Sequence, residues 1–237
     1  DLARLGLWPK NKLVTVESGK IDHLIPVLQA LETRIITIAQ SERPGLLAYL
    51  NNLGLTEVSN AAIVDIGYSA TVQGYLNDLI NKGINGYYLM TRKRAEQVSS
   101  KYKVIAQGYF CHYIHPDINS PVILRESFSL EKLLSSDDAQ IVSYRQADSG
   151  DILPEFRHLA DEERLSMLKR AEIRRGIMDF VNQSIMIRDK LVSDFKVPPD
   201  IAIDLFEEFI AHPTKTKKDI LGALVLDDYY CGRGIVS

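Results

Sequence analysis

Short hydrophobic runs alternate with longer amphipathic segments along the first hundred of the chain's 237 residues. Runs rich in β-branched and aromatic residues predict strands, because these side chains fit a pleated backbone. Between the runs, apolar residues recur every three or four positions, which is the spacing of one helix face. The two patterns predict strands over 12–17, 34–39, 61–66 and 86–91, and helices over 21–31, from Pro44 to near Gly54, and over 72–82.

Strands that are separated by helices in this way pair in parallel through right-handed crossovers. The run over 61–66 is almost continuously apolar, which predicts a strand buried on both faces. We therefore expect an α/β fold, in which a parallel sheet is flanked by helices in a Rossmann-like arrangement.

The second half of the chain has a different pattern, in which helical segments predominate. Segments 104–115 and 121–124 fit either strands or irregular sheet edges. The elements expected beyond them are a short helix over 127–134, a strand over 140–144, a turn at 148–151, and helices over 161–195, 201–210 and 217–224. We divide the chain into a Rossmann-like core over 1–100 and a mixed, then helical extension over 101–237 that packs on the core.

Composition narrows the possible functions. A formal net charge of −3 gives no electrostatic support for nucleic-acid binding. Cys111 and Cys231 are the only cysteines, and they predict neither a disulfide framework nor a structural zinc site, which fits a cytoplasmic setting. No apolar run reaches the roughly 18 residues of a membrane span. The chain starts at Asp1 rather than Met, so we expect a longer polypeptide whose other modules are its partners.

The segment from Asp65 to Thr71 is the strongest candidate for a binding site. It follows a predicted buried strand and precedes a predicted helix, and it contains Gly67, Tyr68 and Ser69. In α/β proteins such a turn lies at the carboxyl ends of the strands, where ligands bind. Its N–H groups and hydroxyls would suit an anion such as phosphate. The alternative is that Ser69 or Thr71 caps the helix while Asp65 braces the turn.

Charged residues follow two other predicted strands. Glu42 and Arg43 come directly after the predicted strand over 34–39, so we expect them at the same sheet edge as Asp65. Arg43 could grip a phosphate and Glu42 could act as a general base, or the two could form a surface ion pair. The run Arg92–Arg94 follows the fourth predicted strand and favours a solvated turn over a diphosphate site. His112 and His115 are interpreted as ordinary edge histidines.

Three known phosphate-binding loops match Asp65–Thr71 in part. The letters Asp-x-Gly-x-Ser are those of the actin-like sugar kinases, but there the loop returns into a strand. The phosphoribosyltransferase loop has the same strand-to-helix setting, but here Ile66 replaces its second acid and its Thr-Gly pair is missing. The haloacid-dehalogenase phosphatases need a second Asp two residues after the nucleophilic Asp, and here Gly67 stands in that place after Asp65. A dinucleotide fingerprint with three glycines is absent.

The order of motifs along the chain resembles a bacterial family. The resemblance rests on 41–50, 63–73 and 86–88, and later on 143–144, 154–156, 176–181 and 221–224. These segments are similar to the region that follows the phosphatase-like part of large predicted hydrolases of the haloacid-dehalogenase superfamily. Such proteins are associated with surface-polysaccharide biosynthesis and sometimes carry glycosyltransferase modules. The nucleophilic Asp-x-Asp motif is missing from this chain, so the resemblance implies no phosphatase activity for it.

Two classes of function remain after these comparisons. The first is a module that binds a phosphorylated sugar or nucleotide sugar in surface-polysaccharide biosynthesis, with a transferase reaction as one possibility. Its expected catalytic residues are Asp65 and Glu42, and its expected ligand-binding residues are Arg43, Gly67, Tyr68, Ser69 and Thr71. The second is a non-catalytic domain that docks or regulates neighbouring modules. Phosphoribosyl transfer is a third possibility, and nothing in the sequence identifies a cofactor or a metal centre.

Overall fold

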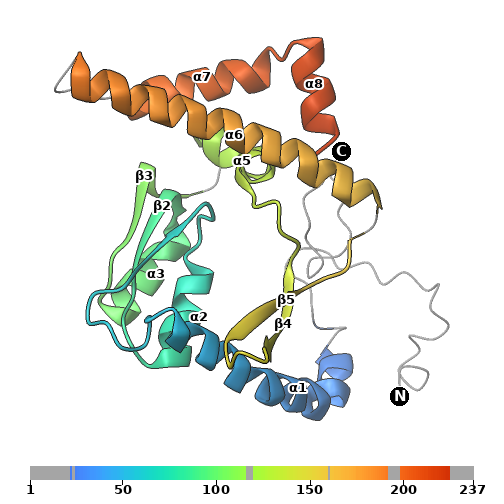
Figure 1. Cartoon of the computed structure of the whole chain (residues 1–237). Helices are drawn as coiled ribbons and strands as arrows, with labels where there is room; N and C mark the ends of the chain where they lie inside the picture. Colours follow the sequence, from blue (N-terminus) through green and yellow to red (C-terminus); the bar gives the residue numbers. More distant parts are fainter. Residues whose placement is uncertain (1–21, 23–24, 116–119, 160, 192–197, 225–237) are drawn as a thin grey trace.

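A three-stranded parallel sheet lies at the centre of the first half of the chain. The computed structural model describes residues 22, 25–115, 120–159, 161–191 and 198–224. Its elements in chain order are α1 (Ile25–Asn52), β1 (Ala62–Asp65), α2 (Thr71–Ile80), β2 (Asn85–Arg92), α3 (Lys93–Tyr102), β3 (Ala106–Ile114), α4 (Val122–Arg125), α5 (Ser127–Leu134), β4 (Ile141–Gln146), β5 (Ile152–Phe156), α6 (Asp161–Lys190), α7 (Pro199–Ala211) and α8 (Lys215–Gly222) (Figure 1).

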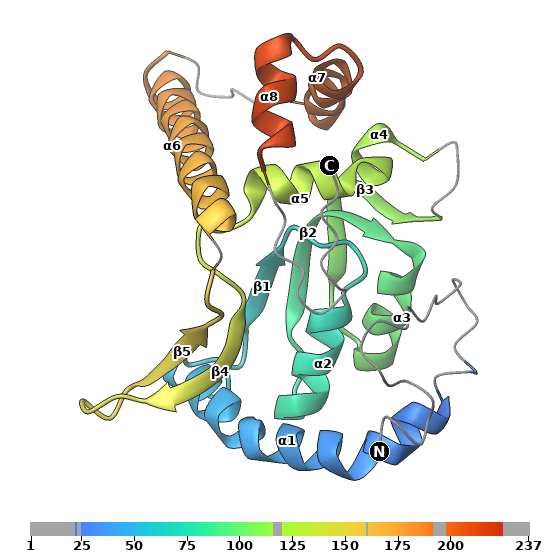
Figure 2. The ribbon, with the colours of Figure 1, turned by 90° about the vertical axis from the view of Figure 1, so that its right-hand side faces the viewer.

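The sheet has the strand order β1-β2-β3, and both neighbouring pairs are parallel. Helices α2 and α3 form the two crossovers and lie together on one face of the sheet (Figure 2). The expected α/β fold is confirmed, because a parallel sheet flanked by helices is followed by a mostly helical part. The arrangement is consistent with a Rossmann-like fold.

The core of this unit lies between the sheet and the two crossover helices. Ala70, Tyr88, Ala95 and Ala106 form one buried cluster there. The opposite face is open among the described residues, since 88% of Val64 is exposed and Tyr87 pairs beside it on the same face. The prediction that the strand over 61–66 is buried on both faces is therefore wrong. Strand β1 is an edge strand, and its apolar run does not indicate a covering layer on each side.

The predicted strand over 34–39 is also wrong, because these residues lie inside the long helix α1. Their β-branched residues favour a strand locally, but propensity is a weak prior that the wider chain can override. The hydroxyl of Thr37 donates to the carbonyl of Thr33 at 2.8 Å, as a threonine can within a helix. The predicted helix over 21–31 is confirmed from Ile25 onward, and the predicted strand over 12–17 lies outside the described residues.

Pro44 does not open a new helix as expected but lies within α1. A proline there leaves one helical hydrogen bond unmade, since it has no N–H. Gly45 follows it and faces the β4–β5 hairpin, where a Cβ atom would lie 3.1 Å from Cβ of Tyr144. The rings of Tyr49 and Tyr144 also pack at 4.9 Å between centroids. This close approach fixes the antiparallel hairpin against α1.

Short helices pack against the end of the sheet where β2 and β3 finish. Met90 forms a second buried cluster with Ile123 and Leu124 of α4, and Phe206 of α7 packs against it. Residues 121–124, expected as a strand or an irregular edge, thus contain most of a helix. The other predicted elements of the described second half are confirmed within a few residues, β3 among them as a strand. No helix in the described part of the chain is long and apolar enough to span a membrane.

Candidate functional site

The loop 66–70 joins β1 to α2 at the carboxyl edge of the sheet, as expected. An Asp65 side-chain oxygen accepts a hydrogen bond from the Gly67 N–H at 2.8 Å. A Cβ atom on residue 67 would lie 3.2 Å from both carboxylate oxygens, so glycine leaves room for this turn. The carbonyl of Tyr68 accepts from the Arg92 N–H at 2.8 Å. The loop is therefore fixed to the ends of both β1 and β2.

The loop has an inward side and an outward side. Ala70 is only 2% exposed and adopts a left-handed φ of 56°, and the Tyr68 ring packs against the Met90 cluster. Ser69 and Thr71 are half-buried, and neither hydroxyl has a hydrogen-bond partner among the described residues. The alternative in which one of them caps α2 is thus not what the structure shows. The N-cap position is Ala70, which has no side-chain acceptor.

Arg92 ends strand β2 and stacks on the loop. Its guanidinium carbon lies 4.0 Å from the centroid of the Tyr68 ring. Its Nε is buried without a hydrogen-bond partner, and within the described part of the chain no carboxylate pairs with it. A buried donor without an acceptor is unfavourable unless a ligand or water satisfies it. The run Arg92–Arg94 is therefore not simply a solvated turn, since its first member is half-buried and held in place.

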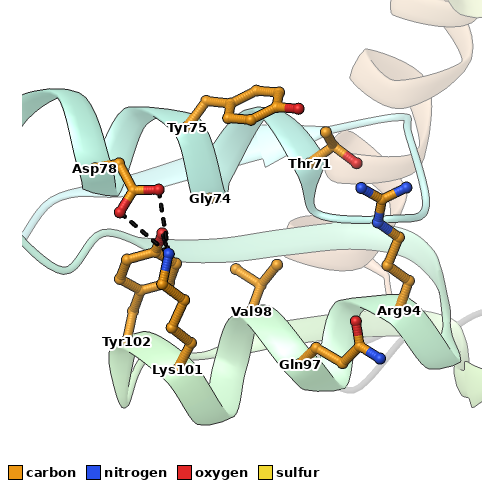
Figure 3. Close-up of a pocket in the computed structure, with 9 residues that line it drawn as sticks. All are labelled: Thr71, Gly74, Tyr75, Asp78, Arg94, Gln97, Val98, Lys101 and Tyr102. Carbon is orange, nitrogen blue, oxygen red and sulfur yellow. Dashed lines mark hydrogen bonds and ion pairs between the residues drawn. The ribbon is translucent and has the colours of Figure 1, made fainter. Parts of the chain in front are cut away.

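A groove between α2 and α3 opens at the same edge of the sheet. It has a volume of about 220 Å³, and Thr71 and Arg94 lie at its carboxyl-edge end, each in the first turn of its helix. Figure 3 shows the Arg94 side chain extending toward Thr71. Gly74 and Val98 bring the helices together below them, since a Cβ on Gly74 would lie 3.6 Å from Val98. Arg94 forms no ion pair with any described residue.

The opposite end of this groove has polar groups that pair with one another. The Lys101 ammonium lies 3.2 Å from the Asp78 carboxylate and donates to the Tyr102 hydroxyl at 2.5 Å (Figure 3). Hydrogen bonding by Tyr102, followed by that of Lys101, lowers the pKa of Asp78. These groups satisfy one another, whereas Arg94 at the carboxyl-edge end of the groove has no ion-pair partner among the described residues.

Glu42 and Arg43 lie at the opposite edge of the sheet, so the expectation that they join Asp65 is wrong. Both belong to α1, which runs past the end of α2 (Figure 2). The Arg43 guanidinium donates to the carbonyl of Leu79 at 3.4 Å, near the last residue of that helix. The ten residues of α2 span about 15 Å, which separates Arg43 from the loop. Arg43 and Glu42 instead line a groove of about 500 Å³ between α1 and β4.

His112, interpreted from the sequence as an ordinary edge histidine, has defined partners at the carboxyl end of β3. Its Nδ1 accepts from the Gly108 N–H at 3.2 Å and from the Thr91 hydroxyl at 3.1 Å. The Thr91 oxygen in turn accepts from the Tyr113 N–H at 3.1 Å. Because the Gly108 N–H can only donate, the hydrogen of the neutral ring lies on Nε2. Two register shifts between β2 and β3 create these contacts, and no sequence pattern predicts such bulges.

The carboxyl edge thus collects donors that the described protein leaves without acceptors. They are the first N–H groups of α2 and α3, neither of which has a side-chain cap, the hydroxyls of Ser69 and Thr71, and the guanidiniums of Arg92 and Arg94. The arrangement suits an anion with several oxygens. Among the described residues, no group of three or more His, Cys, Asp or Glu side chains could hold a metal ion.

Comparison with known proteins gives no further assignment. No family model matches the chain, and no curated protein or solved structure matches it. Function is therefore argued from the fold and from the residues at the carboxyl edge.

Proposed function

We propose that this chain binds a phosphate-bearing ligand, of the class of sugar phosphates and nucleotide sugars, at the carboxyl edge of its sheet. The observation that carries the proposal is Arg92, a half-buried arginine whose Nε has no acceptor and whose guanidinium is held over the Tyr68 ring. An arginine guanidinium matches phosphate oxygens through paired donors. The uncapped N-terminus of α2, which follows the same loop, adds N–H groups with a favourable dipole.

Asp65 supports a sugar on the same ligand. One of its oxygens is engaged by the Gly67 N–H, which orients the carboxylate at the end of β1. The remaining acceptor capacity suits a sugar hydroxyl, and the arginines would bind the phosphate beside it. Glu42 lies on α1 next to Arg43, which contacts the far end of α2, and it takes no part in this proposal.

A transferase reaction is the activity that we propose to test with a nucleotide sugar. Glycosyl transfer breaks the bond between the sugar and its diphosphate, so negative charge develops on the leaving phosphate. Arg92 and Arg94 at the carboxyl edge would stabilise that charge. We propose surface-polysaccharide biosynthesis as the setting, since it uses sugar donors of this kind.

Isothermal titration calorimetry with pyrophosphate, glucose 1-phosphate, UDP-glucose and free glucose tests the binding step. We expect binding of the phosphate-bearing ligands but not of glucose. Arg92→Gln should weaken binding by about tenfold or more, the effect of losing one charged hydrogen bond. Arg43→Gln is the matched control, since it removes an arginine from the opposite edge. Equal weakening by both variants, or full binding by Arg92→Gln, would refute the assignment.

A second candidate function is a domain that docks another module of the same polypeptide. One observation favours it: α1 leaves several large apolar side chains between 41% and 50% exposed, namely Ile25, Leu28, Ile35, Ile36 and Ile38. Exposed apolar patches of this kind often mark interaction surfaces. Hydrogen exchange tests it, since α1 amides should exchange more slowly in the longer polypeptide than in this chain alone. Unchanged exchange would remove this candidate.

A further inference from the structure

Helix α6 continues well past the part of the molecule on which it packs (Figure 1). Its first half contacts α5, and Ser166 and Arg170 there are 1% and 4% exposed. From Arg174 to Leu191, the described side chains are exposed apart from that of Ser184, which is half-buried. Phe180, Ile187 and Leu191 are 65%, 43% and 79% exposed. Large apolar side chains on a helix are normally buried against another element.

The exposed half of α6 carries a coiled-coil repeat. Residues 173, 177, 180, 184, 187 and 191 are separated by four, three, four, three and four positions, and all but Ser184 are large and apolar. We refer to these six residues as the seam. A 4-3 spacing places side chains along one line of a helix that pairs with another helix. Ser166 and Arg170 occupy the preceding positions of the same repeat, so the face that is buried on α5 continues into the seam.

We propose that the seam pairs with the seam of a second copy of this chain, with the two helices antiparallel. A two-fold axis beside Asn182 places Ile173 of one copy opposite Leu191 of the other, and Ile177 opposite Ile187. The same axis places Phe180 opposite Ser184. All six seam residues then lie in three kinds of layer, and each layer occurs twice because of the symmetry.

Side-chain size is the argument for a second copy in this orientation. The largest residue of the seam, Phe180, meets the smallest, Ser184, and interfaces that alternate large and small residues pack without voids. A parallel pair would instead place Phe180 against Phe180 and leave two serines facing each other. The residues beside the seam nearest the axis are Val181 and Gln183, which carry no charge. Two identical helices therefore bring no like charges together at their centre.

A size exchange across the seam tests the proposal by sedimentation velocity of the 237-residue chain. The wild type should form dimers. Phe180→Ser leaves a void in two layers and should raise the dissociation constant by about a hundredfold. Ser184→Phe places two phenylalanines in each of those layers and should also weaken the dimer. The double variant restores one Phe and one Ser per layer and should recover most of the affinity.

The controls test whether the effect is specific to the seam or follows from replacing any exposed apolar side chain. Leu205 of α7 is 67% exposed, close to the value for Phe180, so Leu205→Ser is the matched variant and should leave the dimer unchanged. Circular dichroism of each variant shows whether α6 remains helical. In a background with Cys111 and Cys231 replaced by Ser, a mixture of Phe180→Cys and Ser184→Cys chains should oxidise to the mixed disulfide. Ser184→Cys alone should not cross-link.

Several results would overturn this inference. A wild-type chain that is monomeric at its highest soluble concentration would do so. A double variant no better than Ser184→Phe would contradict the antiparallel pairing, as would efficient cross-linking of Ser184→Cys to itself. Monomers that instead bind anionic lipid vesicles through α6 would assign the exposed face to a membrane surface. None of these outcomes bears on ligand binding at the carboxyl edge.

Discussion

The two edges of the parallel sheet differ in how the protein satisfies their polar groups. At the amino edge, where the chain turns from α2 into β2 and from α3 into β3, side chains form hydrogen bonds with the backbone groups of these turns. At the carboxyl edge, where the strands turn into helices, donors remain without acceptors among the described residues. The same sheet therefore has one edge that the protein completes and one that it leaves available to a ligand.

At the amino edge, four side chains form hydrogen bonds with the backbone between the helices and the strands. The amide nitrogen of Gln73 donates to the carbonyls of Ile84 and Ile105 at 2.6 and 2.8 Å. Asn77 accepts from the Ile84 N–H at 2.8 Å and Asn85 from the Ile105 N–H at 3.0 Å. Ser99 donates to the carbonyl of Val104 at 2.6 Å. Buried backbone groups are normally paired, and here side chains do this where the ladder and the helices end.

The carboxyl edge has fewer internal partners. The Asp65 carboxylate and the Tyr68 carbonyl each accept one hydrogen bond, which positions the loop. Neither α2 nor α3 receives a side-chain cap, and Arg92 and Arg94 pair with no described carboxylate. Under the proposed function, the amino edge contributes to stability and the carboxyl edge binds the ligand. Substitutions at the two edges should therefore have different effects.

The largest expected effect is on stability, and it comes from replacing Gln73, whose side-chain amide binds the backbone at the amino edge. Gln73→Leu leaves the buried carbonyl of Ile84 unpaired and removes the acceptor of the Tyr88 hydroxyl. It also takes one of two donors from the carbonyl of Ile105, which still accepts from the Gly86 N–H at 2.7 Å. We expect the free energy of unfolding to fall by about 3–5 kcal/mol, since each unsatisfied buried group costs about 1–3 kcal/mol. Urea denaturation measures this change.

Gln97→Leu is the matched control for that prediction. Gln97 is exposed on α3, so its replacement should change the free energy of unfolding by less than about 0.5 kcal/mol. Similar losses from both variants would show that the amino-edge hydrogen bonds do not carry the stability assigned to them.

Tyr88→Phe should have a smaller effect on the free energy of unfolding, and it should also change how that free energy depends on pH. Burial, followed by the charge of Asp65, raises the pKa of Tyr88. A group whose pKa is raised on folding contributes stability below its unfolded pKa of about 10 and loses it as the pH rises through the folded value. Wild-type stability should therefore fall as the pH rises above about 10, and Tyr88→Phe should reduce that fall.

At neutral pH the free energy of unfolding of the same variant should be about 1 kcal/mol lower, because the hydrogen bond from Tyr88 to Gln73 at 2.9 Å is removed. Tyr75 is 68% exposed, so Tyr75→Phe serves as the control and should leave the pH profile unchanged. Thermal or urea unfolding followed from pH 7 upward compares the three proteins. An alkaline fall that persists in full in Tyr88→Phe would contradict this account.

The repeating pattern along the chain predicted the crossover unit well. Strands β1 and β2 and helix α2 fall close to their predicted ranges, because period and turn residues are local signals. The error at 34–39 arose because β-branched residues there are exposed along a helix, so that their local preference is not decisive. The error in the burial of β1 arose because an edge position depends on strand order, which periodicity does not encode.

The candidate site could be predicted only in part for the same reason. The loop 65–71 was identified because one contiguous segment contains the strand end, the glycine and the hydroxyls. Glu42 and Arg43 were misplaced because their position depended on the incorrect strand. The stacking of Arg92 on Tyr68 and the anchoring of His112 depend on contacts between strands, so single-segment patterns give no signal for either.

Backbone amide NMR during a titration with pyrophosphate tests the comparison between the edges most directly. The account predicts that the N–H signals of Gly67, Ser69, Thr71 and Arg94 shift as the anion binds, whereas those of Ile84 and Ile105 do not. Shifts that are confined to the amino edge, or spread equally over both edges, would contradict it.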